Sequence, residues 1–141
     1  MEKVVFDADL YIDWINVGRH EDLLLNRQFL RYMSTVVLME LRAGAVRRTD
    51  QRLVERLQAS FARTDRLLNP TPQTFWEAGH VLLELRRAFR YDIKKRFQIT
   101  NDILIALSCR QIGATLISRN VRDFQAIHRV IPFRFVAVEQ A

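Results

Sequence analysis

Short apolar runs rich in β-forming residues alternate with helical patterns along the whole chain. The β-like runs fall at residues 3–8, 32–33, 115–118 and 133–138, and the helical patterns at 10–17, 21–30, 35–44, 50–68, 74–89, 102–112 and 121–128. Two parallel strands need a long crossover between them, and that crossover is usually a helix. The alternation therefore predicts an α/β layered domain with a mostly parallel sheet.

Helix boundaries follow from residues that suit the first turn. Caps are expected at Asp9, at Ser34 or Thr35, and at Thr100 or Asn101. Asp102 would then lie in the first turn of its helix, where capping alone could explain it. Asp13 is expected to be structural or exposed. Along residues 74–89 the apolar positions form one broad face, which predicts core positions for Phe75 and Trp76.

The chain has 141 residues, 49% of them hydrophobic, which suits one domain with one core. No apolar run approaches the roughly 20 residues that span a bilayer. The apolar run at residues 4–6 meets Asp7 at once, unlike a signal peptide. We therefore expect a soluble cytoplasmic protein that does not bind membranes. Cys109, the single cysteine, lies in an apolar stretch and is expected to be buried.

The chain is basic, with 22 Lys and Arg against 16 Asp and Glu and a formal net charge of +6. Such a charge favours polyanionic partners, either nucleic acid or an acidic protein segment. The densest basic run comprises Arg86, Arg87, Arg90, Lys94, Lys95 and Arg96, interleaved with Phe89, Tyr91 and Phe97. This mixture suits RNA phosphates and exposed bases. A solvated helix end and loop explains it equally well.

Acidic residues occur where the predicted fold would bring them together. Asp7 ends the first β-like run, Asp102 begins the helix before residues 115–118, and Asp123 follows that run. Glu40 lies on a helix near the second run. The carboxyl ends of parallel strands share one edge of a sheet, where functional groups collect. We therefore expect these four side chains to converge.

A cluster of carboxylates is unfavourable unless a cation neutralises it. Oxygen ligands without His or Cys at ligand spacing suit Mg²⁺ or Mn²⁺. The three histidines, His20, His80 and His128, are isolated in the sequence and are not expected to be ligands or bases. The acidic residues thus predict a site for a hard dication.

Four segments in order resemble the PIN-domain ribonucleases: VVFDADLYID, STVVLMELRAG, NDILIAL and LISRNVRDF. The chain length is similar to that of the VapC-type toxins of type II toxin–antitoxin systems. The resemblance covers nearly the whole chain. It implies a single PIN-like domain over residues 1–141, with a three-layer α/β/α fold and a mostly parallel central sheet.

The same resemblance implies roles for individual residues. Asp7, Glu40 and Asp102 match the first three acids of the family, with Mg²⁺ or Mn²⁺ held chiefly by Asp7 and Asp102 to activate a water molecule. At the fourth position the family often has an acid, whereas this chain has Asn120, followed by Asp123. Asn120 could replace the acid, Asp123 could supply the charge, or Asp123 could only cap a helix. Ser118 and Asn101 are expected to support the catalytic residues.

The function that the resemblance implies is metal-dependent endoribonuclease activity, exerted as the toxin of a toxin–antitoxin pair. Its partners would be RNA and an antitoxin whose basic side chains enter the acidic pocket. Homodimers, and heterotetramers or larger assemblies with the antitoxin, are also implied, and the apolar helices of residues 50–89 offer a surface for them.

Two alternatives stay open from the sequence. The chain could be a non-catalytic PIN-like module that binds RNA or a partner through the same pocket. The motif Asp7-x-Asp9 also resembles the haloacid-dehalogenase phosphatases, in which the first Asp is the nucleophile. Tyr11 does not fit that family's pattern, and the chain has no later Gly-Asp-type acidic motif.

Overall fold

The computed structural model describes residues 1–89 and 96–139 of the chain. Its sheet has five strands in the order β3-β2-β1-β4-β5, and every neighbouring pair is parallel. The strands are β1 (Glu2–Phe6), β2 (Phe29–Ser34), β3 (Leu67–Leu68), β4 (Thr115–Ser118) and β5 (Phe135–Ala137). The predicted α/β class with a parallel sheet is confirmed.

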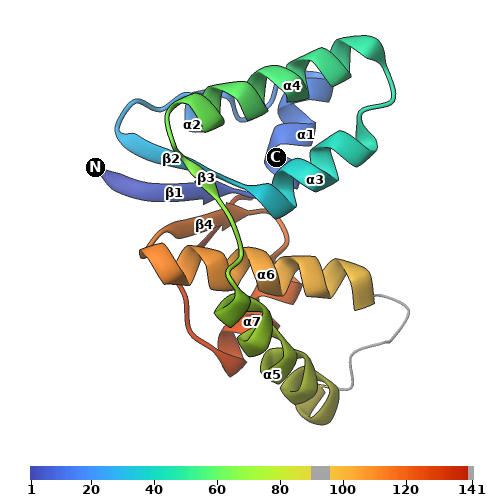
Figure 1. Cartoon of the computed structure of the whole chain (residues 1–141), viewed down its shortest axis with the longest axis vertical. Helices are drawn as coiled ribbons and strands as arrows, with labels where there is room; N and C mark the ends of the chain where they lie inside the picture. Colours follow the sequence, from blue (N-terminus) through green and yellow to red (C-terminus); the bar gives the residue numbers. More distant parts are fainter. Residues whose placement is uncertain (90–95, 140–141) are drawn as a thin grey trace.

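Helices cover both faces of this sheet and give three layers (Figure 1). The helices are α1 (Ala8–Val17), α2 (Glu21–Leu24), α3 (Thr35–Gly44), α4 (Arg48–Arg63), α5 (Pro72–Phe89), α6 (Arg96–Ile112) and α7 (Val121–Val130). Helices α1 to α4 lie on one face, and α5 to α7 lie on the other. This arrangement follows from right-handed crossovers, because the chain moves from β1 toward β3 and then returns past β1 to β4.

Strand β1 is the centre of the sheet and of the core. Val4, Val5 and Phe6 are fully buried, and Phe6 pairs with Ile117 of β4. Two-sided burial explains why this strand reads as a continuous apolar run rather than an alternating one. From β1 the next strands are added on one side, as β2 and β3, and the later strands on the other side, as β4 and β5. A topological switch point therefore lies at the carboxyl ends of β1 and β4.

Helix α6 packs across the second face and is buried along most of its length. Ile103, Ile105 and Cys109 are each fully buried, which confirms the expectation for the cysteine. No helix in the described part of the chain has the length and apolarity needed to cross a membrane.

The helix predicted at residues 21–30 is wrong. Helix α2 ends at Leu24, and β2 begins at Phe29. Asn26 turns the chain between them, where its Oδ1 accepts a hydrogen bond from the backbone N–H of Gln28 (2.9 Å). Pairing of Phe29 with Glu2 of β1 extends β2 well beyond the two residues expected from the local pattern.

The helix predicted at residues 50–68 also ends too late. Helix α4 stops at Arg63, Asp65 adopts a positive φ of 55°, and Leu67 and Leu68 form β3. Leu67 pairs with Met33 of β2, so pairing with a strand distant in the sequence overrides the helical spacing of these two leucines.

Two further expectations fail on the second face. Helix α6 begins at Arg96, so Thr100 and Asn101 are not its caps and Asp102 lies in its second turn. Phe75 and Trp76 are 58% and 79% exposed, although their spacing predicted core positions. The buried face of α5 runs through Thr74, Ala78, Val81 and Leu85, and the two aromatic side chains lie off this face.

Smaller differences concern element ends. The first strand stops at Phe6 rather than at residue 8, the last strand covers Phe135–Ala137 only, and α5 and α7 are each two residues longer than predicted. The predicted cap Ser34 is confirmed: its Oγ accepts hydrogen bonds from the N–H groups of Val36 (3.1 Å) and Val37 (3.3 Å).

Candidate active site

Asp7 stands at the carboxyl end of β1, beside Ser118 at the end of β4. The Asp7 N–H donates to the Ile117 carbonyl (2.9 Å), which continues the strand ladder by one residue. Ser118 Oγ donates to Asp7 Oδ2 (2.7 Å), and Asp7 Oδ1 accepts from the Ala8 N–H (2.8 Å). Asp7 is therefore the N-cap of α1, in place of the predicted Asp9.

Asp9 takes part in the same group of contacts. Its Oδ2 accepts from the Arg119 N–H (3.0 Å) and lies 3.1 Å from Ser118 Oγ. The Ser118 hydroxyl carries one proton and already accepts from the Asn120 N–H (3.0 Å). It cannot donate to Asp7 and Asp9 together, so these two carboxyl groups compete for one donor.

Asp102 is fully buried on α6 and is linked to the end of β4 through Asn120. Asn120 Nδ2 donates to Asp102 Oδ2 (3.1 Å) and lies 3.3 Å from Asp123 Oδ2. The amide thus joins an acid of α6 to an acid of α7. Asn120 therefore contacts Asp102 directly, and Asp123 lies next to it through the same amide, while the role of each at the fourth position stays a prediction.

Glu40 enters from α3, and Gln98 connects it to α6. Gln98 Nε2 donates to Asp102 Oδ1 (3.2 Å), and a hydrogen bond from the Gln98 side chain lowers the pKa of Glu40. Glu40 Oε1 is buried and accepts no hydrogen bond from the described residues. Glu40 also lines a pocket of about 110 Å³ together with Ile12, Ile15 and the α4 residue Asp50.

These five carboxyl groups, which we call the acid cluster, are Asp7, Asp9, Glu40, Asp102 and Asp123. Burial, followed by repulsion from Asp9 and Glu40, raises the pKa of Asp7 to about 7. Burial, with repulsion from Asp7, Asp123 and Glu40, raises the pKa of Asp102 to about 8. The pKa values of Glu40 and Asp9 are also raised, chiefly by burial. The structure therefore brings the predicted acids close enough to repel one another.

The donor chemistry of the acid cluster suits a hard dication. Among the described residues, no three Asp, Glu, His or Cys side chains are close enough together to hold a metal ion by themselves. Mg²⁺, however, keeps several waters and usually takes only one or two protein carboxylates. Asp7 raises the pKa of Asp102 across the switch point, and these two carboxyl groups fit that requirement. Glu40 adds a buried oxygen that has no hydrogen-bond partner among the described residues.

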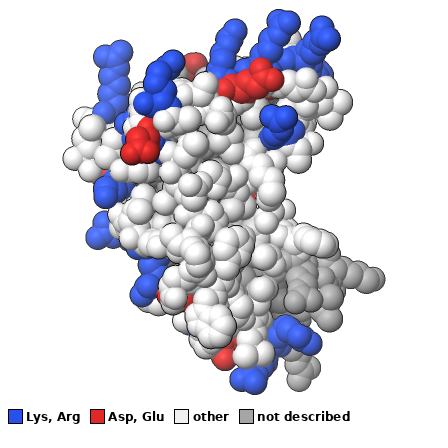
Figure 2. Space-filling model, viewed as in Figure 1, with Lys and Arg blue, Asp and Glu red and all other residues white. Residues whose placement is uncertain are grey.

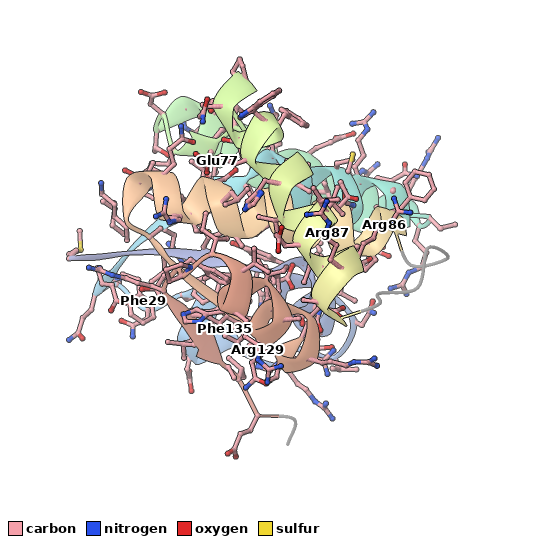
Figure 3. The ribbon with its side chains drawn as sticks, turned by 90° about the horizontal axis from the view of Figure 1, so that it is seen from below. Phe29, Glu77, Arg86, Arg87, Arg129 and Phe135 are labelled. Carbon is pink, nitrogen blue, oxygen red and sulfur yellow. The ribbon has the colours of Figure 1, made fainter. Side chains whose placement is uncertain are left out.

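Other predicted residues lie apart from these contacts or outside the described chain. Asn101 is half-buried on α6 beside Asp102, and its supporting role stays a prediction. Arg86 and Arg87 are exposed near the end of α5 (Figure 3). Arg90, Lys94, Lys95 and Tyr91 lie outside the described residues, as do the side chains of Phe89 and Arg96.

Asp13 is structural, as expected. Its Oδ2 pairs with Arg119 Nε (3.1 Å) and contacts His20 Nε2 (2.9 Å). His20 is therefore not isolated. Asp13, which His20 contacts, also pairs with the side chain of Arg119, and the Arg119 N–H donates to Asp9. The contact between His20 and Asp13 therefore supports the loop that carries the site.

Sequence reasoning missed two residues of the site, Asp9 and Gln98. Asp9 was assigned to helix capping, although it lies two residues from Asp7. Gln98 lies four residues before Asp102, a spacing that places two side chains on one face of a helix. The sequence predicts a helix only from residue 102, so this spacing could not be recognised as helical.

Comparison with known proteins identifies the family of this fold. The family model described as PIN domain matches residues 4–130 of the chain. None of the curated proteins matches at a significant level.

Three solved structures illustrate the similarity in fold. VapBC2 from Rickettsia felis, bound to a DNA fragment from its promoter, gives a TM-score of 0.69 at 18% identity, covering 97% of this chain and 99% of that chain. DNA-bound VapBC from Salmonella typhimurium gives a TM-score of 0.68 at 22% identity, covering 97% of this chain and 98% of that chain. VapBC-5 from Mycobacterium tuberculosis, of the VapBC family of toxin–antitoxin systems, gives a TM-score of 0.65 at 18% identity, covering 98% of this chain and 100% of that chain.

Proposed function

This chain belongs to the PIN domain family, and on that premise we propose that it is a metal-dependent endoribonuclease and the toxin of a toxin–antitoxin pair. The observation that carries the proposal is the acid cluster at the switch point between β1 and β4, where four helices distant in sequence, α1, α3, α6 and α7, each supply at least one acid. Such mutual repulsion is costly, and a site that gains a dication recovers that cost.

Asp7 and Asp102 would hold Mg²⁺ or Mn²⁺. When bound, such an ion lowers the pKa of a water molecule and stabilises the charge that develops on a scissile phosphate. Ser118 orients Asp7, while Asn120 orients Asp102 and Asp123. Glu40, with its unpaired buried oxygen and raised pKa, is placed to accept a proton from the attacking water.

Cleavage of RNA by the purified chain tests this function. We expect hydrolysis with Mg²⁺ or Mn²⁺ that stops in EDTA, and a loss of about 100-fold or more in Asp7→Asn and Asp102→Asn. Asp22→Asn, on the exposed surface of α2, serves as the matched control and should keep full activity. Equal activity in wild type and Asp7→Asn would point to a contaminating nuclease and favour the non-catalytic alternative. The phosphatase alternative gains no support from the family match.

An antitoxin partner is proposed from the solved relatives, which are VapBC complexes. Basic side chains of that partner would occupy the acid cluster and satisfy the carboxylates as a cation does. Co-expression with the product of the neighbouring gene should abolish cleavage, and sedimentation of the chain alone should give a homodimer. Undiminished cleavage in the stable complex would contradict inhibition at this site.

A further inference from the structure

Helix α4 carries a line of arginines that the acid cluster does not use. Arg48, Arg52, Arg56 and Arg63, which we call the arginine row, are all exposed. We propose that the arginine row binds the phosphate backbone of single-stranded RNA and extends the substrate contact beyond the acid cluster. The inference rests on the proposed function only in taking RNA as the partner. The basic run at residues 86–96 was the surface expected from the sequence.

Helical spacing places these arginines on one face. Arg48, Arg52 and Arg56 follow at intervals of four residues, about 6 Å apart along the axis, and Arg63 stands two turns further. The opposite face carries the buried Val54 and Phe61. The whole row spans about 22 Å. A straight series of guanidinium groups at this spacing can follow successive phosphates of an extended strand.

Few acids oppose the arginine row. None of its four members forms an ion pair with another described residue, and on α4 the pair that does form joins Arg47 to Asp50 (2.9 Å). Between the arginines on this face lie the small residues Ala59 and Ser60 and one exposed acid, Glu55. Figure 2 shows Lys and Arg side chains projecting one after another along the edge of the molecule that α4 occupies. The result is a positive ridge open to solvent.

The row begins next to the acid cluster. Asp50 and Val54, on the inner face of the first two turns of α4, line the same pocket as Glu40, and Arg48 and Arg52 lie on the outer face of those turns. An RNA strand whose scissile phosphate lies at the acid cluster could therefore continue over the start of α4 and along its outer face. This continuity makes the row an extension of the same site.

The side chains on this face favour a nucleic acid over an acidic protein. Protein partners obtain most of their binding energy from buried aromatic or aliphatic anchors. The outer face of the arginine row offers charged and small residues, and the pocket that α4 lines together with Leu38 and Met39 of α3 lies to one side of the row. Binding to phosphates needs no such anchor, because counterion release supplies the affinity.

The test measures binding without cleavage. The full chain with Asp7→Asn, in EDTA, is titrated against a fluorescein-labelled 20-nucleotide RNA at several KCl concentrations. For single strands the slope of log K against log salt is about 0.7 per phosphate contact. The additional triple change Arg52→Ala, Arg56→Ala, Arg63→Ala should therefore reduce the slope by about 2. Replacing the same three residues by Lys should restore it, because the charge is kept.

A matched control removes equal charge from the opposite edge of the sheet. Arg19, Arg27 and Arg134 are exposed and lie at the amino ends of the strands. Changing these three to Ala should leave the slope unchanged. Circular dichroism and melting curves of all variants establish that the fold is intact.

The outcomes separate this inference from the proposed function. An equal loss of slope in both triple variants, or in neither, overturns the arginine row as a specific surface. Loss of binding to polyglutamate but not to RNA overturns it in favour of an acidic protein partner. If only the arginine-row variant loses slope, and the wild-type chain does not cleave RNA with any divalent metal, the nuclease proposal fails and the RNA-binding surface stands.

Discussion

At the scale of single residues, the electrostatic cost of the acid cluster depends on how many protons its carboxyl groups hold. Ser118 has one hydroxyl proton for two neighbouring carboxylates, and burial raises the proton affinity of both Asp7 and Asp102. The site can lower this electrostatic cost by binding protons or by binding a cation. Protons and metal therefore compete for the same oxygens, and both stability and metal affinity must depend on pH.

The first prediction concerns stability without metal. The pKa values of Asp7 (about 7) and Asp102 (about 8) in the folded chain exceed the ordinary value of 3.8, so folding favours their protonated forms. This contribution to stability is complete below pH ~4 and is lost as pH rises through 7 to 8. In EDTA, Asp102→Asn should melt about 5 °C above wild type at pH 8, with a smaller difference at pH 5. Differential scanning fluorimetry measures this. A wild type as stable as the variant at pH 8 would refute it, and Asp22→Asn is the control.

The second prediction concerns Gln98. Its amide lowers the pKa of both Glu40 and Asp102, so Gln98→Ala should raise both pKa values and weaken Mn²⁺ binding at pH 7 by about fivefold. The deficit should shrink at pH 9, where the carboxylates ionise regardless. Isothermal titration calorimetry gives the affinities. Gln73→Ala removes a similar contact, to Glu77 on α5 (3.2 Å), and should leave Mn²⁺ binding unchanged. A pH-independent deficit would mean that Gln98 acts only on the fold.

At the scale of elements, the helices and strands place the acidic side chains next to one another. Helix α3 starts directly after β2, so the Ser34 cap fixes where α3 begins and hence where Glu40 projects. Helix α6 carries Asp102 and Gln98 one turn apart, and this face meets α3. The caps and the helix–helix contacts thus decide the geometry of the cluster.

The third prediction tests the α3 cap. Ser34 is fully buried and accepts two backbone N–H groups, so Ser34→Ala should lower the free energy of unfolding by about 1 kcal/mol, within a range of about 0.5–2. Ser34→Thr keeps the oxygen and should lose less. Urea denaturation followed by circular dichroism measures the change. Thr49→Ala, exposed on α4, is the control. An Ala variant as stable as wild type would show that water replaces the cap.

At the scale of the whole molecule, one core supports both helical layers. Strand β1 is buried between them, and the last strand joins the rest through Phe124, whose ring contacts those of Phe133 (6.2 Å) and Phe135 (5.4 Å) between centroids. This arrangement supports the prediction that residues 1–141 fold as a single domain.

The fourth prediction tests that single domain. Phe124→Ala removes a fully buried ring and should lower the free energy of unfolding by about 3–5 kcal/mol. The loss should appear in one cooperative transition seen by far-ultraviolet circular dichroism and by fluorescence of the partly buried Trp14. Phe75→Ala, at an exposed ring of α5, should change stability little. Two separate transitions would show that β5 and α7 form an independent unit.

The sequence alone determined the parallel α/β class, the strand at residues 115–118 and the convergence of Asp7, Glu40, Asp102 and Asp123, because continuous apolar runs and strand-end acids are local patterns with few alternatives. Tertiary structure decided that Leu67 and Leu68 pair as a strand, that Trp76 is exposed, and that Asp9 and Gln98 belong to the site. Gln98 joins the site because α6 begins earlier than the sequence predicts, whereas strand pairing, burial of a helix face and the hydrogen bond from the Arg119 N–H to Asp9 each depend on a partner that is distant in the chain. No local pattern specifies that partner.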